Sequence, residues 1–421
     1  MLHNSNPDAM CDTTIEHALH SGRQRFVILG MSDAPHPYFM PEAVEAIARG
    51  RVFSGGLRHR EIVHTLLPQG AEWIDITVPL DDVFEQYRAH EEIVVFASGD
   101  PLFFGFANTV MNRLPDAEVV VFPAFNSLQM LAHAMRLPYH DMRIVSLTGR
   151  PWHEFDRALI ERTPKIGLLT DREHTPATIA RRMLDYGYTD YTMSVGTQMG
   201  NPKEQKLDTL SLREATEREF GRPNCVILTT NNRNMPYRAP MGLSETDFMP
   251  LDGRVKMITK KPFRLVSLSC LDLHRASSFW DVGFCTGSVS IEAKLNFPHL
   301  HVAAFEIRPE GAALMQENSR RFGAPGIDCR IGDFLDADIT DLMPPDAVFI
   351  GGHGGKLVEI IAKVHRSMTA GGLLVFNSVS EESRALFLAG IEACGMKLLS
   401  SMRLMADANN PIDVLQARKQ D

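Results

Sequence analysis

The residues from Phe279 to Glu292 combine a short apolar run, a turn of small residues and the start of a helix. Gly283 and Gly287 can adopt positive φ angles, so a ligand can approach the backbone there. A helix that begins near Ser288 would direct unpaired N–H groups and the positive end of its dipole at the space above the turn. The pattern therefore predicts a binding site for a nucleotide-like cofactor.

Two cofactors can be compared on the spacing of this turn. A dinucleotide fingerprint needs a second glycine two residues after the first, where this chain has Cys285, and no phosphate-binding lysine follows Gly287. Asp281, Gly283 and Thr286 instead fit the Asp-x-Gly-x-x-Thr-Gly turn of methyltransferases that use S-adenosylmethionine (SAM), in which the turn faces an amino-acid moiety. A strand–glycine–helix turn without a cofactor is the third alternative.

Two acidic residues follow where the rest of such a cofactor would lie. His301 to Glu306 predicts a strand that ends in an acid able to accept hydrogen bonds from both ribose hydroxyls. Asp333, in Arg330-Ile-Gly-Asp-Phe334, stands where an adenine amino group could donate. A further strand from Asp346 runs into the glycine-rich segment Gly351–Gly355. This alternation of strands and helices predicts a doubly wound parallel sheet that binds its ligand at the carboxyl ends of the strands.

Length and composition limit the classes of protein. A chain of 421 residues favours two domains, and a net charge of −9 argues against general affinity for nucleic acid. The first 25 residues lack the apolar segment of a signal peptide, and no apolar run is long enough for a membrane span. The six cysteines form no C-x-x-C pair, so we expect reduced thiols in a cytoplasmic protein and no metal site.

The chain reads as two α/β domains. We expect a flexible extension over residues 1–24, a first domain over 25–230, a linker over 231–253 and a second domain over 254–421. The linker is rich in Asn, Pro and Gly. The loop motifs of the two domains differ, so the chain is not a simple duplication.

Three motifs of the first domain resemble those of the tetrapyrrole methylases, in particular the branch that methylates a corrin ring at C5. The motifs are Ala97–Gly105, Phe122–Gln129 and Ser146–Trp152. The second domain is similar to methyltransferases that act at C15 of the same ring and decarboxylate it, on the segments Met257–Lys261, Gly351–Gly355 and Asn410–Leu415. The order of the domains is that of the fused methyltransferases of cobalamin biosynthesis.

The resemblance implies a tetrapyrrole-methylase fold of two α/β subdomains, followed by a Rossmann-like methyltransferase with a mostly parallel sheet. It implies a SAM site in each domain. In the first domain the matching residues are Gly99, Asp100, Leu102 and Ser127. In the second they are Thr259, Asp281, Gly283, Phe284, Cys285, Thr286, Gly287, Glu306, Gly332, Asp333 and Phe334.

The implied activity is methylation of a late precorrin or cobalt-precorrin at C5 and C15, with decarboxylation of the C12 acetate. The related enzymes imply a homo-oligomer, either a dimer or a tetramer. Two alternatives stay open: a SAM-dependent methyltransferase for RNA or another small molecule, and a SAM-binding protein without turnover. The acidic charge, with only three Trp and seven Tyr, argues against RNA.

One loop departs from the family pattern. The first strand of tetrapyrrole methylases usually ends in a Gly-x-Gly-Pro-Gly loop beside the substrate, whereas this chain reads Leu29-Gly-Met-Ser-Asp-Ala-Pro-His-Pro37. Only Gly30 of the three glycines is present. The sequence therefore leaves open how the first domain holds its substrate.

Proton transfer and substrate binding need further residues. Histidine titrates near neutrality, and His353 lies in a Gly-Gly-x-Gly-Gly loop, so we expect it to be the catalytic proton-transfer group of the second domain. A precorrin carries many carboxylates, which basic residues must bind because the chain as a whole is acidic. The candidates are Lys260, Lys261, Arg264 and Lys356, within a basic cluster that also includes Arg254 and Lys256.

Overall fold

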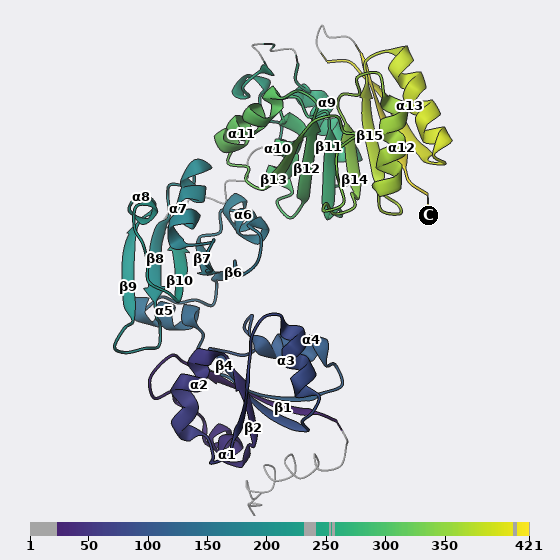
Figure 1. The fold of residues 1–421 in the computed structure, drawn as a ribbon. Helices are drawn as coiled ribbons and strands as arrows, with labels where there is room; N and C mark the ends of the chain where they lie inside the picture. The colour runs from purple at the N-terminus through teal and green to yellow at the C-terminus, as the bar shows by residue number, and fades with distance from the viewer. Residues whose placement is uncertain (1–22, 231–240, 252–253, 255–256, 407–410, 421) are drawn as a thin grey trace, which may run out of the picture. The chain divides into compact units, whose positions relative to one another are not determined.

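The computed structural model describes residues 23–230, 241–251, 254, 257–406 and 411–420 (Figure 1). The chain divides into two compact units, residues 1–140, 194–208 and 220–227 in one and residues 141–193, 209–219 and 228–421 in the other. The predicted domain boundaries stay a prediction. Most of the predicted extension and linker, together with Lys256 and Asn410, lies outside the described residues.

Five parallel strands form the first sheet, in the order β3-β2-β4-β1-β5. Its strands are β1 (Arg25–Met31), β2 (Val52–Gly55), β3 (Glu72–Asp75), β4 (Glu92–Ser98) and β5 (Glu118–Phe122). The helices of this region are α1 (Pro41–Arg49), α2 (Leu57–Val63), η3 (His64–Leu66), α3 (Leu80–Tyr87), α4 (Phe106–Arg113) and α5 (Ser127–Met135). Along β1, Phe26 and Ile28 pack into one core cluster while Val27 and Leu29 pack into another, so both faces of the sheet are covered.

The second sheet has the order β6-β7-β10-β8-β9. Its strands are β6 (Arg143–Ser146), β7 (Lys165–Leu169), β8 (Thr192–Thr197), β9 (Lys206–Ser211) and β10 (Asn224–Thr229). The helices are α6 (His153–Ile160), α7 (Pro176–Asp185) and α8 (Leu212–Thr216). Strands β6 and β7 are parallel, so the loops that follow them emerge at the same edge.

The third sheet has seven strands in the order β13-β12-β11-β14-β15-β17-β16. The first five are parallel, while β17 is antiparallel to both β15 and β16. The strands are β11 (Ser278–Val282), β12 (His301–Glu306), β13 (Ile327–Ile331), β14 (Ala347–Ile350), β15 (Leu373–Ser378), β16 (Lys397–Leu404) and β17 (Ile412–Arg418). The helices are η4 (Glu245–Asp247), α9 (Lys261–Cys270), α10 (Ser288–Asn296), α11 (Glu310–Phe322), α12 (Leu357–Ser367) and α13 (Glu381–Ala393).

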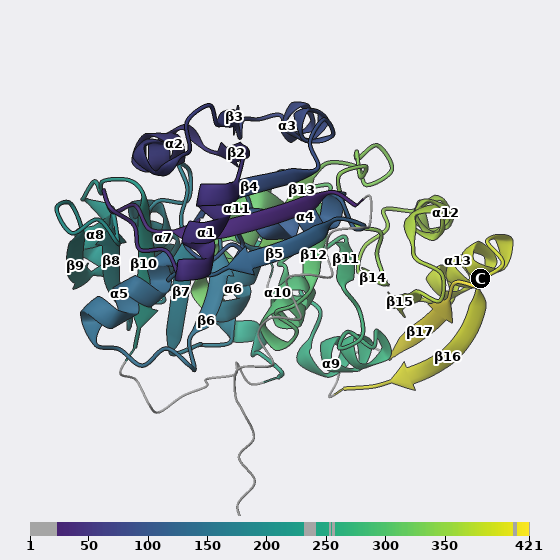
Figure 2. The ribbon, with the colours of Figure 1, turned by 90° about the horizontal axis from the view of Figure 1, so that it is seen from below.

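Helices cover both faces of this third sheet (Figures 1 and 2). Trp280 and Val282 of β11 pack in one core cluster with residues of α12 and α13. Phe279, between Ser278 and Trp280, packs in another cluster with residues of α9 and α10. The central strand is therefore buried on both sides, as expected of a doubly wound sheet, and its carboxyl end is where a ligand can bind.

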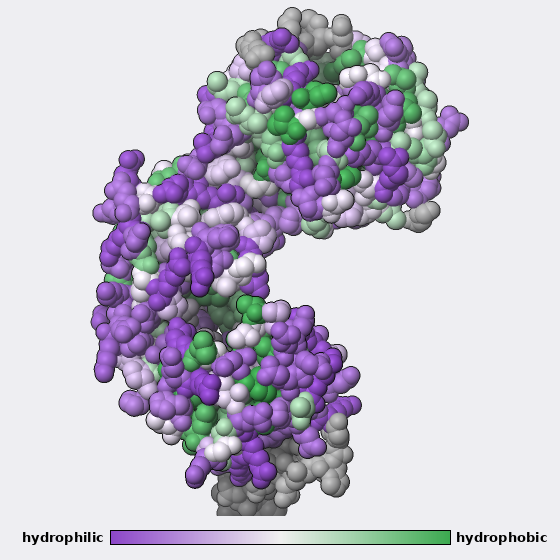
Figure 3. Space-filling view, viewed as in Figure 1, coloured by the Kyte–Doolittle hydropathy of each residue, from purple (hydrophilic) through white to green (hydrophobic). Residues whose placement is uncertain are grey.

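Polar side chains are common on the face drawn in Figure 3. Figure 3 shows hydrophilic side chains over most of the visible face of the C-terminal part, with apolar side chains in small separate groups. Among the described residues, no helix has the length and apolar character needed to cross a bilayer.

Candidate active site

The turn after β11 has the backbone geometry that its sequence predicts. Gly283 and Gly287 adopt φ angles of 78° and 75°, and Gly287 is the N-cap of α10. Cys285 adopts a φ of 54°, in the left-handed region that disfavours residues with a side chain. A dinucleotide-binding turn would have glycine where this chain has Cys285, yet this cysteine adopts a backbone conformation typical of glycine.

Gly283 also brings two loops into backbone contact. A Cβ atom added at Gly283 would lie 2.6 Å from the amide nitrogen of Gly352, a distance that real side chains do not reach. The Gly351 N–H donates to the carbonyl of Val282 over 2.8 Å. The turn after β11 and the loop after β14 therefore form one continuous wall.

Glu306 holds the same turn from the neighbouring strand. Its carboxylate accepts hydrogen bonds from the backbone N–H groups of Cys285, at 2.9 Å, and Arg308, at 3.1 Å. Its side chain is only 3 % exposed. The Arg308 guanidinium also donates to this carboxylate over 3.1 Å, and Glu306 lines the cavity described below.

Two buried polar atoms of the turn lack a hydrogen-bond partner among the described residues. They are Oδ1 of Asp281 and Oγ1 of Thr286. The other carboxylate oxygen of Asp281 accepts from the backbone and the hydroxyl of Ser290. Burial raises the pKa of Asp281 to about 7, against the opposing effect of the Ser290 hydrogen bonds. Because buried polar atoms are normally paired, the unpaired oxygen of Asp281 fits a ligand with a positively charged donor, as the amino group of SAM is.

A cavity of about 550 Å³ opens at the carboxyl ends of β11, β12, β14 and β15. This size is usual for a small-molecule site. The predicted residues that line it are Thr259, Lys260, Asp281, Gly283, Phe284, Cys285, Glu306, Gly332, Asp333, Phe334, His353 and Lys356. Of the site residues predicted for the second domain, Lys261, Arg264, Thr286 and Gly287 do not line it.

The prediction that Arg264 binds substrate does not fit its surroundings. Arg264 is completely buried and forms an ion pair with Glu292, which is also completely buried. Its guanidinium also donates to the carbonyls of Thr259 and Leu243. A buried guanidinium whose donors are used inside the protein cannot bind a substrate carboxylate, and Arg264 instead fixes the backbone that leads into α9.

The two predicted lysines of this segment differ in position. Lys260 is the N-cap residue of α9 and lines the cavity. Lys261 is exposed, and its backbone N–H donates to the Glu245 carboxylate. Of the two, only Lys260 therefore lies where a bound molecule could contact it.

His353 lies at the cavity, packed edge-on against Phe376 with ring centroids 5.8 Å apart. Its Nδ1 accepts a hydrogen bond of 3.2 Å from the Gly355 N–H. A neutral His353 therefore carries its proton on Nε2.

Sequence reasoning missed several residues of the cavity. Asn377 and Val379 follow the apolar run of β15, and Phe263 begins the buried side of α9. The Ser267 hydroxyl contacts the Asn377 side chain over 2.9 Å. A polar residue at the carboxyl end of a parallel strand is the signal that could have identified Asn377.

The first domain brings its predicted cofactor residues to one edge of the first sheet. Gly99 adopts a φ of 63°, and a Cβ added there would lie 3.1 Å from Cα of Asn126. The Asp100 carboxylate accepts from the Leu102 N–H over 2.9 Å, so this side chain stabilises its own turn. Ser127 begins α5, and its hydroxyl is hydrogen-bonded to the buried Cys225.

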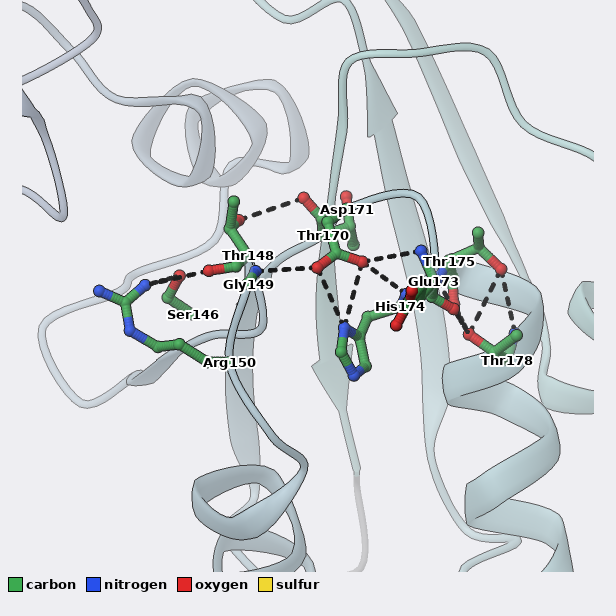
Figure 4. Close-up of polar contacts among 10 residues, drawn as sticks. All are labelled: Ser146, Thr148, Gly149, Arg150, Thr170, Asp171, Glu173, His174, Thr175 and Thr178. Carbon is green, nitrogen blue, oxygen red and sulfur yellow. Dashed lines mark hydrogen bonds and ion pairs between the residues drawn. The ribbon is translucent and has the colours of Figure 1, made fainter. Parts of the chain in front are cut away.

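The third motif of the first domain is held by an acid on the next loop (Figure 4). The Asp171 carboxylate accepts from the N–H groups of Gly149, Glu173 and His174 at 2.7 to 2.9 Å. Although burial opposes the shift, these donors and the His174 ring lower the pKa of Asp171 well below its usual range. The loops after β6 and β7 are thus bound to each other, and they border a shallow pocket with Arg150.

Both parts of the chain match families of methyltransferases. Residues 40–215 match the tetrapyrrole (corrin/porphyrin) methylases, and residues 251–417 match the precorrin methyltransferase domain. The predicted fold class is confirmed by these matches and by the sheets described above.

Some named relatives are similar to most of the chain, and others are similar to one part of it. The decarboxylating precorrin-6Y C(5,15)-methyltransferase of Sinorhizobium sp is 29% identical over 82% of this chain and 83% of the relative. The decarboxylating cobalt-precorrin-6B C(15)-methyltransferase of Salmonella typhimurium is 39% identical over 42% of this chain and 96% of the relative. A crystal structure of precorrin-6Y C5,15-methyltransferase from Geobacter metallireducens is 30% identical, with a TM-score of 0.39, and covers 43% of this chain and 98% of its own.

The chain belongs to the decarboxylating precorrin-6Y C5,15-methyltransferases. The predicted family is therefore confirmed, and the alternatives of an RNA methyltransferase and of a SAM-binding protein without turnover are set aside.

Proposed function

We propose that the two halves of this enzyme divide its reactions, with C5 methylation in the first half and C15 methylation with decarboxylation in the second. As a member of its family, the chain methylates precorrin-6Y at C5 and C15 and decarboxylates it, in cobalamin biosynthesis. Each half of the chain matches a separate methylase family, so each half can supply one methyl-donor site. The main support is the cavity of the second half, which gathers twelve of the predicted residues beside the unpaired Asp281 oxygen.

In the second half, the turn from Asp281 to Gly287 and the acids Glu306 and Asp333 would hold SAM. SAM, when bound, supplies an electrophilic methyl group on a sulfonium. Asp281 would bind the cofactor's ammonium group, Glu306 the ribose hydroxyls and Asp333 the adenine amino group. Phe284 and Phe334 would exclude water from the site, which matters because orientation and dryness are the protein's main contributions to such a transfer.

We assign proton transfer in the second half to His353. Its Nε2 proton is not engaged by the Gly355 contact, which uses Nδ1. The ring is held edge-on by Phe376, and both neighbours in its loop are glycines. Loss of CO₂ leaves an electron pair that the conjugated ring accepts and that a nearby acid must protonate, and His353, which lines the cavity, is the residue that we assign to this task.

Substrate carboxylates would be bound by Lys260 and Lys356, both of which line the cavity. Lys356 is already paired with Asp333 and is half exposed, so it can contact a second carboxylate at the cavity rim. Lys261 does not line the cavity, so we propose that it attracts the anionic substrate only through its charge at long range.

In the first half, the turn Gly99 to Leu102 and the start of α5 at Ser127 would form the second SAM site. Support comes from the positive φ of Gly99 and the close packing of its backbone against Asn126. We further propose a cytoplasmic homo-oligomer, dimer or tetramer, which light scattering coupled to gel filtration would test.

The division of labour is tested with one variant in each half of the full-length protein. Products made with ¹³C-methyl SAM are located by NMR, and CO₂ release is measured separately. Glu306→Gln should abolish C15 methylation and CO₂ release but leave C5 methylation intact, while Gly99→Val should do the reverse. Gly70→Ala is the matched control, because Gly70 also has a positive φ but a side chain there would contact nothing. Normal C15 methylation and CO₂ release in a folded Glu306→Gln variant would refute the division.

A further inference from the structure

Four polar side chains of the first unit form a cluster to which no role has been given so far. They are Asp33 after β1, Arg58 and His59 in α2, and Ser98 at the end of β4. Arg58 Nη2 lies 2.8 Å from Asp33 Oδ1 and 3.4 Å from Ser98 Oγ, while His59 Nε2 lies 2.8 Å from Ser98 Oγ. Asp33 belongs to the loop whose sequence departs from the glycine-rich family pattern.

The cluster lies beside the turn assigned to the methyl donor. Ser98 directly precedes Gly99, and the Gly99 N–H donates to the carbonyl of Met31 over 2.7 Å. A Cβ added at Gly30 would lie 2.4 Å from the Gly99 oxygen, so the backbones of the two loops touch. A methyl donor held by the Gly99 turn would therefore lie close to these side chains.

His59 has a fixed tautomer and charge. Its Nδ1 accepts from the Gly56 N–H over 3.2 Å, so the proton of the neutral ring is on Nε2 and is donated to Ser98. Burial, with the charge of Arg58, lowers the pKa of His59 to about 4, so the ring is neutral at physiological pH. Ser98 accepts from His59 and faces Arg58, which leaves its own hydroxyl proton able to donate.

Arg58 is held in place but still open to solvent. Its side chain is 46 % exposed, whereas that of its partner Asp33 is 15 % exposed. Burial raises the pKa of Asp33, against the opposing charge of Arg58. An arginine has five N–H donors, and the contacts with Asp33 and Ser98 occupy one terminal nitrogen, so the other side of the guanidinium can form a bidentate pair with a carboxylate.

We propose that Arg58 binds an acetate or propionate carboxylate of the tetrapyrrole during methylation in the first half, with Asp33, His59 and Ser98 as positioning residues that fix its guanidinium. The inference rests on the proposed division of labour. A polyanionic ring approaches a chain of net charge −9, so a fixed local cation is needed to hold it at this site. In the loop that lacks the family's glycines, the role of Asp33 is then to orient the Arg58 guanidinium.

The test compares full-length variants with precorrin-6Y as substrate. Arg58→Gln should raise the KM for C5 methylation roughly ten- to hundredfold, with unchanged SAM affinity and unchanged C15 methylation and CO₂ release. Arg58→Lys should restore part of the loss, because the charge is kept but the bidentate geometry is not. Asp33→Asn should raise the same KM by a smaller factor, since it loosens the guanidinium without removing it.

Arg60→Gln is the matched control. Arg60 lies in the same helix and is 54 % exposed, but it pairs with Asp75 and lies over the Trp73 ring. An unchanged KM for C5 methylation in folded Arg58→Gln protein overturns the inference, as does an equal effect of Arg60→Gln. A loss of C15 methylation with normal C5 methylation refutes the division of labour instead. If Arg58→Gln lowers the Tm, the Arg58→Lys and Asp33→Asn variants decide the result.

Discussion

Lys356 Nζ lies 2.7 Å from Asp333 Oδ2 and so joins a residue predicted to bind substrate to one predicted to bind the cofactor's adenine. The hydrogen bond from Lys356, with one from the Leu335 N–H, lowers the pKa of Asp333, and the same pair raises the pKa of Lys356. Both side chains are at the cavity rim and both are charged at neutral pH. The two binding functions therefore meet in a single ion pair.

The two members of this pair should have separable effects. We expect Asp333→Asn to weaken SAM binding in the second half by roughly tenfold, because a neutral amide oxygen is a weaker acceptor for the adenine amino group than a carboxylate. Lys356→Met should leave SAM affinity unchanged and raise the KM for C15 methylation. Calorimetry and steady-state kinetics measure the two quantities, with the exposed Asp336→Asn as control. A common effect of both variants on SAM affinity would contradict separate roles.

His353 should act in the chemical step. We expect His353→Ala to reduce kcat for CO₂ release and C15 methylation by roughly 10² to 10⁴-fold, with little change in KM or in C5 methylation. His353→Gln, which retains a donor near the Nε2 position but does not titrate, should be nearly as impaired. Full activity of His353→Ala would rule out its role in proton transfer.

SAM binding to the second half should depend on the ionisation of Asp281. Since burial raises the pKa of this carboxyl to about 7, it is mostly protonated at pH 6 and mostly ionised at pH 8. A cationic ammonium prefers the ionised form, so the Kd should fall by roughly tenfold between pH 6 and pH 8. Calorimetry over this range measures the trend, and Asp281→Asn should remove it. A Kd that changes equally in both proteins would exclude Asp281 as the cause.

The same ionisation has the opposite effect on the protein without ligand. The pKa of Asp281 in the folded state exceeds its ordinary value of 3.8, so the folded state holds the proton more tightly than the unfolded state. The free energy of unfolding therefore decreases as the pH rises from about 4 to about 7. SAM should offset this loss, and thermal denaturation with and without SAM measures the difference.

The left-handed conformation of Cys285 predicts which residues its position tolerates. Cys285→Gly should leave the Tm nearly unchanged, because relief of the backbone offsets the lost contact of Sγ with the Met257 carbonyl. Cys285→Val should lower the Tm by several degrees, since a β-branched residue at positive φ is strained by about 1–2 kcal/mol. Cys270→Val, at a helical position, is the control. Equal Tm values for the Gly and Val variants would contradict the argument.

The parts of the site that the sequence predicted are those set by local pattern. Strand β12 ends at Glu306 as expected, because an apolar run bounded by an acid has the length of a buried strand. Gly283 and Gly287 have the positive φ angles that the turn required. The carboxyl ends of parallel strands lie at the same edge of a sheet, so the predicted strands were enough to place Glu306, Asp333 and His353 together. All three line one cavity in the structure.

The parts that it missed depend on packing between distant segments. The sequence predicted a substrate-binding cation at Arg264, whereas in the structure Arg264 is buried in an ion pair with Glu292 on α10. Nothing local to either residue indicates that the two helices meet. Asn377 was missed for the same reason, since its contact with Ser267 joins β15 to α9 across 110 residues of sequence.

The contact between Gly283 and Gly352 limits how this active site can change. A side chain at Gly283 would displace the Gly352 backbone, so a substitution there would move both the methyl-donor turn and the loop that carries His353. New substrate preferences are therefore reached more easily at other positions that line the cavity, such as Lys260, Asn377 and Val379. Enzymes of this type should accordingly diverge in the rings that they accept while keeping the methyl donor and the proton-transfer group in a constant relation.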